Sequence, residues 1–178
     1  MALVTSKVCL GLLNCKSMEE IKNGIIHSFG NKLRIRVCGI CMDDNKILLV
    51  KHHSLGESGI LWAPPGGGIS FGETAEEALK REFLEETGLS VSIEKFLCVN
   101  EYLSLPLHAI ELFFLVKTTG TLKLGTDPEL QANQQIITDV EWLSIDALQL
   151  LPKNSIHGIL HNIQASADVL HLSGYFNY

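Results

Sequence analysis

Apolar runs alternate along this chain with polar stretches that contain Gly, Pro, Asn and Asp. Runs rich in Ile, Val and Leu that are bounded by such turn residues are typical of β-strands. Asp43-Asp44-Asn45 separates the first two runs and predicts a hairpin turn. The predicted strands are Leu33–Met42, Lys46–Lys51, Val91–Leu103, Ala109–Lys117 and Asp139–Leu143.

Helices are predicted between and beyond these strands. They are Ser17–Phe29, Ala75–Thr87, a helix that starts within Ile145–Leu151, and a C-terminal helix at Ser155–Val169. Ala63–Gly72 and Gly125–Pro128 are predicted loops. Because strands and helices mix without a regular βαβ alternation, the pattern predicts an α/β fold with a mixed sheet that helices cover.

The helix at Ala75–Thr87 has the clearest boundaries. Thr74 is a favourable N-cap, and Glu77 three residues later completes a capping box. Gly88 stands where a left-handed C-cap belongs. The sequence therefore fixes the register of this helix, and with it the direction of each of its side chains.

Composition narrows the possible functions. Hydrophobic residues make up 46% and charged residues 19% of the 178, which is typical of one globular domain. A formal net charge of -6 argues against a protein that binds a nucleic-acid scaffold. A small phosphorylated substrate is compatible with that charge if a metal screens it. Since no apolar stretch approaches the ~20 residues that a membrane helix needs, no membrane association is predicted.

The cysteines indicate a reducing compartment. Their odd number, five, and their loose spacing argue against a disulfide framework, so a cytoplasmic location is predicted. Cys38 and Cys41 form a C-x-x-C inside a predicted strand. Residues i and i+3 of a strand point to opposite faces, which favours two buried thiols over a zinc or redox site.

Three acids carry the candidate chemistry. Glu82, Glu85 and Glu86 stand at i, i+3 and i+4 of the predicted helix and so share one stripe. Leu79 and Phe83 are predicted to point toward the core, which places the acids at its edge. Three like charges repel one another, and a hard divalent cation with its preference for oxygen ligands relieves that repulsion. The alternative is a solvated acidic face that Lys80 and Arg81 neutralise.

The segment upstream favours the metal hypothesis. In Pro64-Pro65-Gly66-Gly67-Gly68 the prolines stiffen the approach, and the glycines let the backbone come close to a ligand. The loop leads to the N-terminal end of the helix, where backbone N–H groups favour anions. A glycine-rich loop at this spacing from a three-acid helix is a much stronger signal than either feature alone.

Together, Gly67-x5-Glu73-x7-Arg81-Glu82-Phe83-Leu84-Glu85-Glu86-Thr87-Gly88-Leu89 resembles the Nudix box at every defined position. Weaker similarity extends over roughly residues 33–150. The resemblance implies a Nudix fold, an α/β/α sandwich around a mixed β-sheet. It divides the chain into an N-terminal extension, residues 1–32, and a single Nudix hydrolase domain, residues 33–178.

The resemblance also implies roles for individual residues. Glu82, Glu85 and Glu86 match the family's metal-binding acids, and the carbonyl of Gly66 matches a further ligand for Mg²⁺, with Mn²⁺ as an alternative. Glu82 or Glu85 is the candidate base that activates water, and Arg81 is a candidate catalytic residue. Glu73 is expected to support the loop and helix through Arg81. An additional acid ligand is open between Glu101, Glu111 and Glu129.

Substrate contacts are predicted less sharply. Arg34 and Arg36 alternate on a strand and share one face, where they either meet phosphates together with Gly67 and Gly68 or cover the sheet with their stems. His52-His53 is interpreted as a polar strand end. His157 and His161, at i and i+4 of the predicted C-terminal helix, are interpreted as surface or interface histidines because no third zinc ligand is evident.

The expected activity is metal-dependent hydrolysis of a nucleoside diphosphate linked to another group, of ADP-ribose or nucleotide-sugar type. The alternatives are a nucleoside triphosphate pyrophosphohydrolase and a non-catalytic nucleotide-sensing domain. The partner is a small nucleotide, and a homodimer is suggested by family analogy alone.

Overall fold

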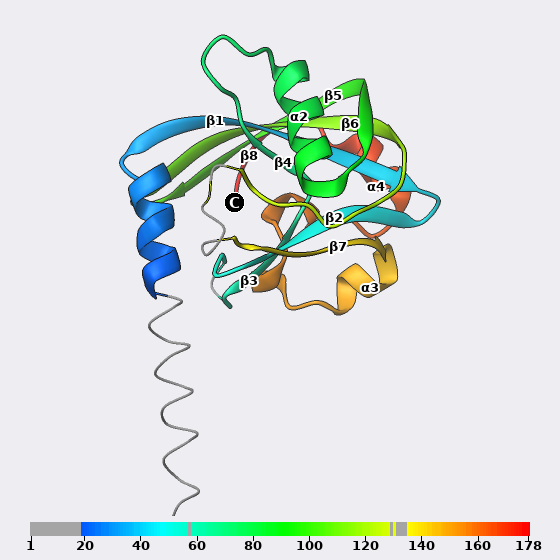
Figure 1. Ribbon diagram of the computed structural model, residues 1–178. Coiled ribbons are helices and arrows are strands. Elements are labelled where there is room, and N and C mark those ends of the chain that lie inside the picture. Colours follow the sequence, from blue (N-terminus) through cyan, green and yellow to red (C-terminus); the bar gives the residue numbers. More distant parts are fainter. Residues whose placement is uncertain (1–18, 57, 129, 131–134) are drawn as a thin grey trace, which may run out of the picture.

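The computed structural model describes residues 19–178 apart from 57, 129 and 131–134. Residues 19–29 are helical, and they lie beside one end of the sheet (Figure 1). The strands are β1 (Lys32–Asp43), β2 (Lys46–His53), β3 (Ile60–Ala63), β4 (Gly66–Gly68), β5 (Ser90–Ser104), β6 (Leu107–Thr119), β7 (Ile137–Ser144) and β8 (Gly174–Asn177). The helices that follow are α2 (Ala75–Thr87), α3 (Ile145–Leu150) and α4 (Ser166–His171), with 3₁₀ turns at Lys153–Ser155 and Gly158–Leu160.

The strands form one mixed sheet. Its order is β3-β2-β1-β6-β5-β8, with β4 paired to β1 and β7 paired to β2. The β1–β6 and β5–β8 pairs are parallel, whereas β5 and β6 form a long antiparallel hairpin. β1 meets β2 only at the hairpin, through Met42 opposite Ile47 and Asp43 opposite Lys46. The two halves of the sheet therefore diverge from this hairpin.

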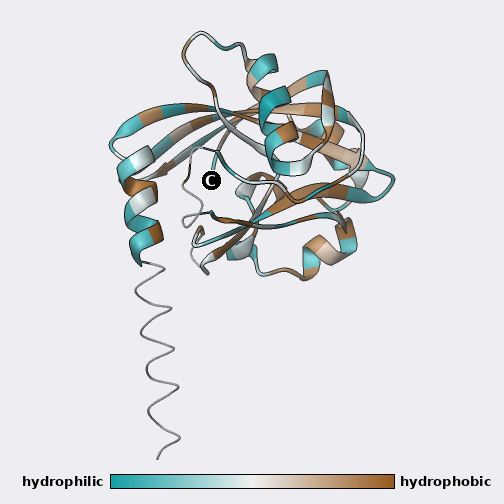
Figure 2. Ribbon diagram, viewed as in Figure 1, coloured by the Kyte–Doolittle hydropathy of each residue, from teal (hydrophilic) through white to brown (hydrophobic). Residues whose placement is uncertain are grey.

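Helical segments cover both faces of the sheet, as the α/β/α sandwich requires. On one face, Leu79 and Phe83 of α2 pack against Val37 and Val116. On the other, α3, the 3₁₀ turns and α4 pack against Phe113 and its neighbours. Hydrophobic residues follow the strands, while the outer surfaces of the helices are more polar (Figure 2). Cys38 and Cys41 fall into these two different cores, which confirms that they point to opposite faces.

Two predicted segments are wrong. The C-terminal helix at Ser155–Val169 does not form, because the chain is broken into 3₁₀ turns and the six-residue α4, and β8 then adds to the sheet. The predicted loop Ala63–Gly72 contains β4, whose three glycines pair with Arg36–Cys38 of β1. The predicted helix at Ser17–Phe29 is confirmed for residues 19–29, and residues 17 and 18 lie outside the described part. None of the described helices has the length and hydropathy to cross a bilayer.

Candidate functional site

Helix α2 carries the acids, and its caps set their direction. The Thr74 side chain accepts from Glu77 N–H at 3.2 Å, the Glu77 carboxylate accepts from Thr74 N–H at 2.9 Å, and Gly88 ends the helix in the left-handed region. The capping box predicted from sequence is therefore present. The buried stripe that contains Leu79 and Phe83 also contains Glu82 and Glu86, whereas Glu85 stays partly accessible. The acids stand at the edge of the core, as predicted.

The backbone of the glycine segment, Gly66–Gly68, lies so close to this stripe that a residue with a side chain would not fit at Gly66 or Gly67. Gly66 has a φ of 150°, and a Cβ there would overlap the Val37 carbonyl of β1. A Cβ at Gly67 would overlap the Glu82 carboxylate. The Gly66 N–H donates to Glu86 Oε2 at 2.9 Å. The absence of side chains thus brings backbone amides and carbonyls against two of the three acids.

Arg81 connects the loop to the helix. Its Nε and Nη2 donate to the two carboxylate oxygens of Glu73, each at 2.9 Å, and Nη2 also donates to the Gly68 carbonyl at 3.0 Å. Its Nη1 donates to Glu82 Oε1 at 2.7 Å and to Glu85 Oε2 at 3.1 Å. Such a two-point Arg–carboxylate pair fixes orientation as well as charge. The contact between Glu73 and Arg81 therefore has the geometry of the predicted support.

Burial makes the ionised acids unfavourable unless a cation is present. Desolvation raises the pKa of Glu86 to about 8 and also raises the pKa of Glu82. By contrast, the hydrogen bonds from Arg81 lower the pKa of Glu73 to about 2. His52 Nε2 lies 4.0 Å from Glu86 Oε1, but burial lowers the pKa of His52 to about 4, so His52 is neutral at pH 7. Without a cation, burial therefore favours the protonated forms of Glu86 and Glu82, and a bound cation would favour their carboxylates.

The donor set fits a hard divalent cation. Within the described residues no three His, Cys, Asp or Glu side chains converge as a ready metal cluster, since Arg81 holds Glu82 and Glu85. The acceptor atoms that the glutamates and Gly66 supply are nevertheless carboxylate and carbonyl oxygens, the ligands that Mg²⁺ and Mn²⁺ prefer. The Glu86 carboxylate is desolvated, and the Gly67 backbone lies close to the Glu82 carboxylate. A cation bound to these carboxylate oxygens would stabilise their ionised forms, which burial disfavours.

The two strand arginines differ in their contacts. Arg36 Nη2 donates to the Gly66 carbonyl at 3.2 Å, and its Nε lies 3.4 Å from Glu111 Oε1. The Arg34 guanidinium lies over the Phe29 ring, 3.9 Å from its centroid. Direct contacts of Arg34, Arg36, Gly67 and Gly68 with phosphate stay predictions.

Sequence reasoning missed a polar group next to the site. Glu111, offered as an extra acid ligand, accepts from Asn100 Nδ2 and pairs with His157 Nε2, each at 2.9 Å. His157 and His161 cap the two ends of the 3₁₀ turn Gly158–Leu160 and do not stand on one α-helix, and His157 is not a surface histidine, because it is largely buried against Glu111. A contact between residues 46 positions apart leaves no local signal in the sequence.

His52 is buried beside Glu86 and is not simply a polar strand end. Its position two residues after the buried Val50 on the same strand could have shown this. Glu101 pairs with His108 and Tyr175, and Glu129 lies outside the described residues.

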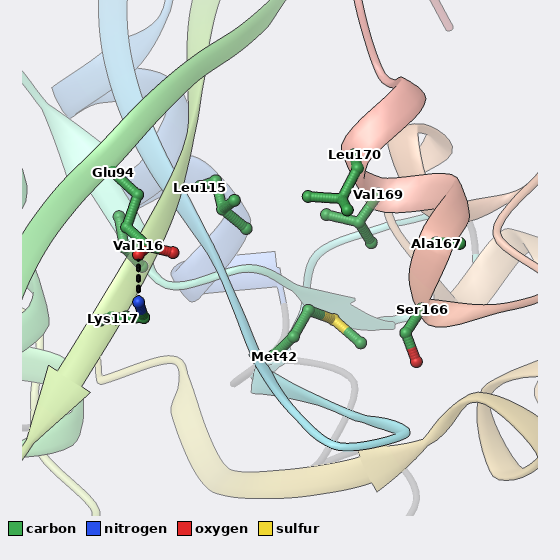
Figure 3. A pocket seen from close by; sticks show the side chains of 9 residues that line it. All are labelled: Met42, Glu94, Leu115, Val116, Lys117, Ser166, Ala167, Val169 and Leu170. Atoms are coloured by element: carbon green, nitrogen blue, oxygen red, sulfur yellow. Dashed lines mark ion pairs between the residues drawn. The ribbon is translucent and has the colours of Figure 1, made fainter.

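A cavity of about 280 Å³ lies elsewhere, between α4 and the β5–β6 hairpin (Figure 3). Met42, Leu115, Val169 and Leu170 supply apolar walls, and the Lys117–Glu94 ion pair lies at its side. None of the acids of α2 and none of the glycines of β4 line it.

Comparisons with known proteins show the family and the fold. The family described as NUDIX domain matches residues 32–161. An ADP-ribose pyrophosphatase of Methanocaldococcus jannaschii is 41% identical over 98 residues, which are 52% of this chain and 56% of that protein. The nucleoside triphosphatase NudI of an Enterobacter species is 29% identical over 132 residues, 68% of this chain and 89% of that protein.

Solved structures show the same fold. A MutT NUDIX hydrolase from Burkholderia pseudomallei superposes with a TM-score of 0.59 at 23% identity, over 79% of this chain and 98% of the other. A UDP-X diphosphatase superposes with a TM-score of 0.54 at 23% identity, over 89% of this chain and 74% of the other. The matched region spans only about half the length of the first curated relative.

Proposed function

This chain belongs to the NUDIX domain family, and from that membership we propose that it is a pyrophosphohydrolase that cleaves a nucleoside diphosphate linked to a second group. The observation that carries the proposal is the approach of the Gly66 and Gly67 backbone to the carboxylates of Glu86 and Glu82, with Glu86 desolvated and Glu85 held next to Glu82 by Arg81. A buried carboxylate at a glycine-lined surface is costly for folding and useful for holding a cation.

In the proposed reaction, the three glutamates and the Gly66 carbonyl would hold a divalent cation, Mg²⁺ in the first place. When bound, it would supply charge neutralisation for the diphosphate and a lower pKa for the attacking water. Glu82 or Glu85 accepts the proton of the water, since both carboxylates lie beside the metal-binding oxygens. Arg81 orients these two carboxylates, and Glu73 holds Arg81 in turn. The strand and loop around Gly67 exclude solvent from one side.

For the substrate we propose an ADP-ribose or nucleotide-sugar type compound. The 41% identity to a relative named ADP-ribose pyrophosphatase supports this class. A nucleoside triphosphate is the second candidate, because the alignment with the nucleoside triphosphatase covers more of both chains. The two classes differ in their products. An ADP-ribose or nucleotide-sugar substrate gives a nucleoside monophosphate and a sugar phosphate, whereas a nucleoside triphosphate gives a nucleoside monophosphate and pyrophosphate.

A substrate panel tests the proposal. The protein is incubated with ADP-ribose, nucleotide sugars, dinucleoside polyphosphates and nucleoside triphosphates, with Mg²⁺ or with chelator, and products are identified by chromatography. We expect metal-dependent release of a nucleoside monophosphate together with a sugar phosphate, whereas pyrophosphate as the second product would favour a nucleoside triphosphate as the substrate. Nucleotide binding without turnover under any metal would instead indicate a sensing domain.

The substitution Glu86→Gln tests the role of the buried acid. It removes one ligand charge while the size of the side chain is kept, so turnover is expected to fall by ~10²-fold or more. Glu76→Gln is the matched control, because Glu76 lies on the exposed side of α2 and pairs with Lys80 at 2.7 Å. Near-normal turnover of the Glu86 variant would overturn the metal assignment.

A further inference from the structure

A row of buried and partly buried polar side chains lies behind the glycine segment. Arg36 of β1 stands opposite Glu111 of β6, which in turn stands opposite Asn100 of β5, so the three are neighbours on one face of the sheet. Glu111 is 6% and Asn100 1% exposed. Charged groups are seldom buried to this extent unless they are paired, and here they are paired with one another.

His157 completes the row from the C-terminal segment. Its Nδ1 accepts from the Ile159 N–H at 3.2 Å, which leaves the ring proton on Nε2, 2.9 Å from Glu111 Oε2. The His157 N–H donates to the Trp62 carbonyl at 2.8 Å, just upstream of Pro64. His157 is thus fixed both to Glu111 and to the strand that leads into the glycine segment.

The row ends on the proposed metal-binding backbone. Arg36 Nε lies 3.4 Å from Glu111 Oε1, and Arg36 Nη2 donates a hydrogen bond to the Gly66 carbonyl. The N–H of Gly66 in turn donates to the Glu86 carboxylate. The peptide groups of Gly66 are therefore held on both sides, by Arg36 at the oxygen and by Glu86 at the nitrogen. Glu111 also neutralises Arg36, so the guanidinium supplies a hydrogen bond without adding net positive charge beside a cation site.

We propose that Arg36 is a positioning residue for the metal site and that Glu111 and His157 hold it in place. This inference rests on the proposed function, since it concerns the carbonyl of Gly66 as a metal ligand. It differs from the expectation that Arg36 contacts substrate phosphate. The chain from His157 through Glu111 and Arg36 fixes the angle of the Gly66 carbonyl, and the C-terminal segment thereby supports a site formed by residues 66–86.

The substitution Arg36→Lys separates positioning from phosphate contact. Lysine keeps the charge opposite Glu111 but lacks the fork that reaches both Glu111 and Gly66. We expect the affinity of the nucleotide-free protein for Mn²⁺, measured by calorimetry, to fall ~10- to 100-fold. At saturating Mn²⁺, kcat falls and KM stays near that of the wild type. A raised KM with unchanged Mn²⁺ affinity would overturn the proposal in favour of a phosphate contact.

The substitution His157→Phe tests the far end of the row. Phenylalanine keeps the ring beside Phe113, whose centroid lies 5.5 Å from that of His157, but removes the donor to Glu111. We expect weaker Mn²⁺ binding in the same direction as for Arg36→Lys. His161→Phe is the matched control, because His161 contacts the carbonyls of Lys153 and Ile156 and lies outside the row. Equal Mn²⁺ affinity in both histidine variants would overturn the role of His157.

These outcomes separate the two proposals. If the wild type hydrolyses a nucleotide and Arg36→Lys binds Mn²⁺ like the wild type, the positioning role fails and the proposed function stands. If the wild type hydrolyses nothing in the panel but Mn²⁺ binding weakens in Arg36→Lys, the enzyme assignment fails and the positioning role stands. Absence of Mn²⁺ binding in the wild type would overturn both.

Discussion

At the scale of single residues, the candidate site depends on where side chains are missing as much as on where they are charged. Gly66 and Gly67 are adjacent, yet an added methyl group would meet different neighbours. At Gly66 it meets the Val37 backbone, whereas at Gly67 it meets only the end of the Glu82 side chain. Moving the Val37 backbone to make room for a methyl group costs much energy, whereas the Glu82 carboxylate can make room by a change of rotamer. The two glycines therefore serve folding and chemistry to different extents.

Alanine substitutions at these positions are expected to separate the two effects. Gly67→Ala should leave stability within ~1 kcal/mol of the wild type, since the contact is with the end of the Glu82 side chain, which can change rotamer. Its hydrolysis should fall ~10- to 100-fold, because Glu82 is displaced. Gly66→Ala should lower thermal stability, because its φ of 150° and the Val37 carbonyl both exclude a side chain. Equal stability of the two variants in a thermal melt would contradict this reasoning.

At the scale of elements, helix α2 is held on the sheet by a close contact at one strand residue. A Cβ at Gly39 of β1 would lie 2.5 Å from Phe83 Cε2 and 2.7 Å from its Cζ. Phe83 is fully buried in the core that α2 shares with Val37 and Val116. Helix α2, which carries the acids, is therefore held on the sheet by the Phe83 ring packed directly on the backbone of Gly39. The distance between α2 and β4 depends on that contact.

Gly39→Ala is expected to overpack this interface and to destabilise the protein by ~1–3 kcal/mol. Chemical denaturation measures the change in the free energy of unfolding. A second substitution, Phe83→Leu, removes ring atoms where the new methyl group stands. The double variant should therefore lose less stability than the sum of the two single variants, as contacting residues are not additive. Full additivity would show that the methyl group and the ring do not meet.

The C-terminal segment shows the limit of element prediction. Apolar residues in Ser155–Val169 suggest one helix, but tertiary contacts divide the segment. Ile156 bridges to Trp62 of β3, Ile159 and Leu160 enter the core beneath the sheet, and Val169 enters it again from α4. In a continuous helix these residues could not all reach the sheet at their present positions, and His157 would lie away from Glu111. Packing against the sheet therefore overrides the local preference for helix.

At the scale of the whole molecule, buried titratable groups couple folding to pH in opposite directions. Burial raises the pKa of Glu86 to about 8 from 4.5, so between these values the unfolded chain binds fewer protons than the folded one and stability falls as pH rises. Burial lowers the pKa of His52 to about 4 from 6.5, so stability from His52 rises with pH over that range. The two effects oppose each other below about pH 6.5.

The metal-free protein is therefore expected to lose stability between about pH 6.5 and 8. The loss comes from ionisation of Glu86 in its buried position. Urea denaturation at pH 6, 7 and 8 measures it, and Glu86→Gln should remove most of the dependence because glutamine does not titrate. A wild-type free energy of unfolding that stays level or rises over this interval would contradict the assigned pKa.

The sequence by itself determined the helix of residues 75–87, its caps, the shared stripe of Glu82, Glu85 and Glu86, and the spacing of that stripe from Gly66 and Gly67. All of these follow from local rules, because a capped helix has a fixed period and a short loop has limited reach. The mixed α/β class also followed from the pattern of elements, and the sandwich was implied by the family resemblance. The domain boundary at residue 32, the cytoplasmic location and the homodimer stay predictions.

Only the tertiary structure decided which groups compensate the buried charges. Arg36, Glu111, Asn100 and His157 come from three strands and a 3₁₀ turn, and they meet because β1 pairs in parallel with β6 while the C-terminal segment crosses beneath both. The desolvation that changes the pKa of Glu86 and His52 likewise depends on what packs above them. Periodicity describes neighbours along the chain, whereas charge pairing and burial depend on neighbours in space, which no local pattern encodes.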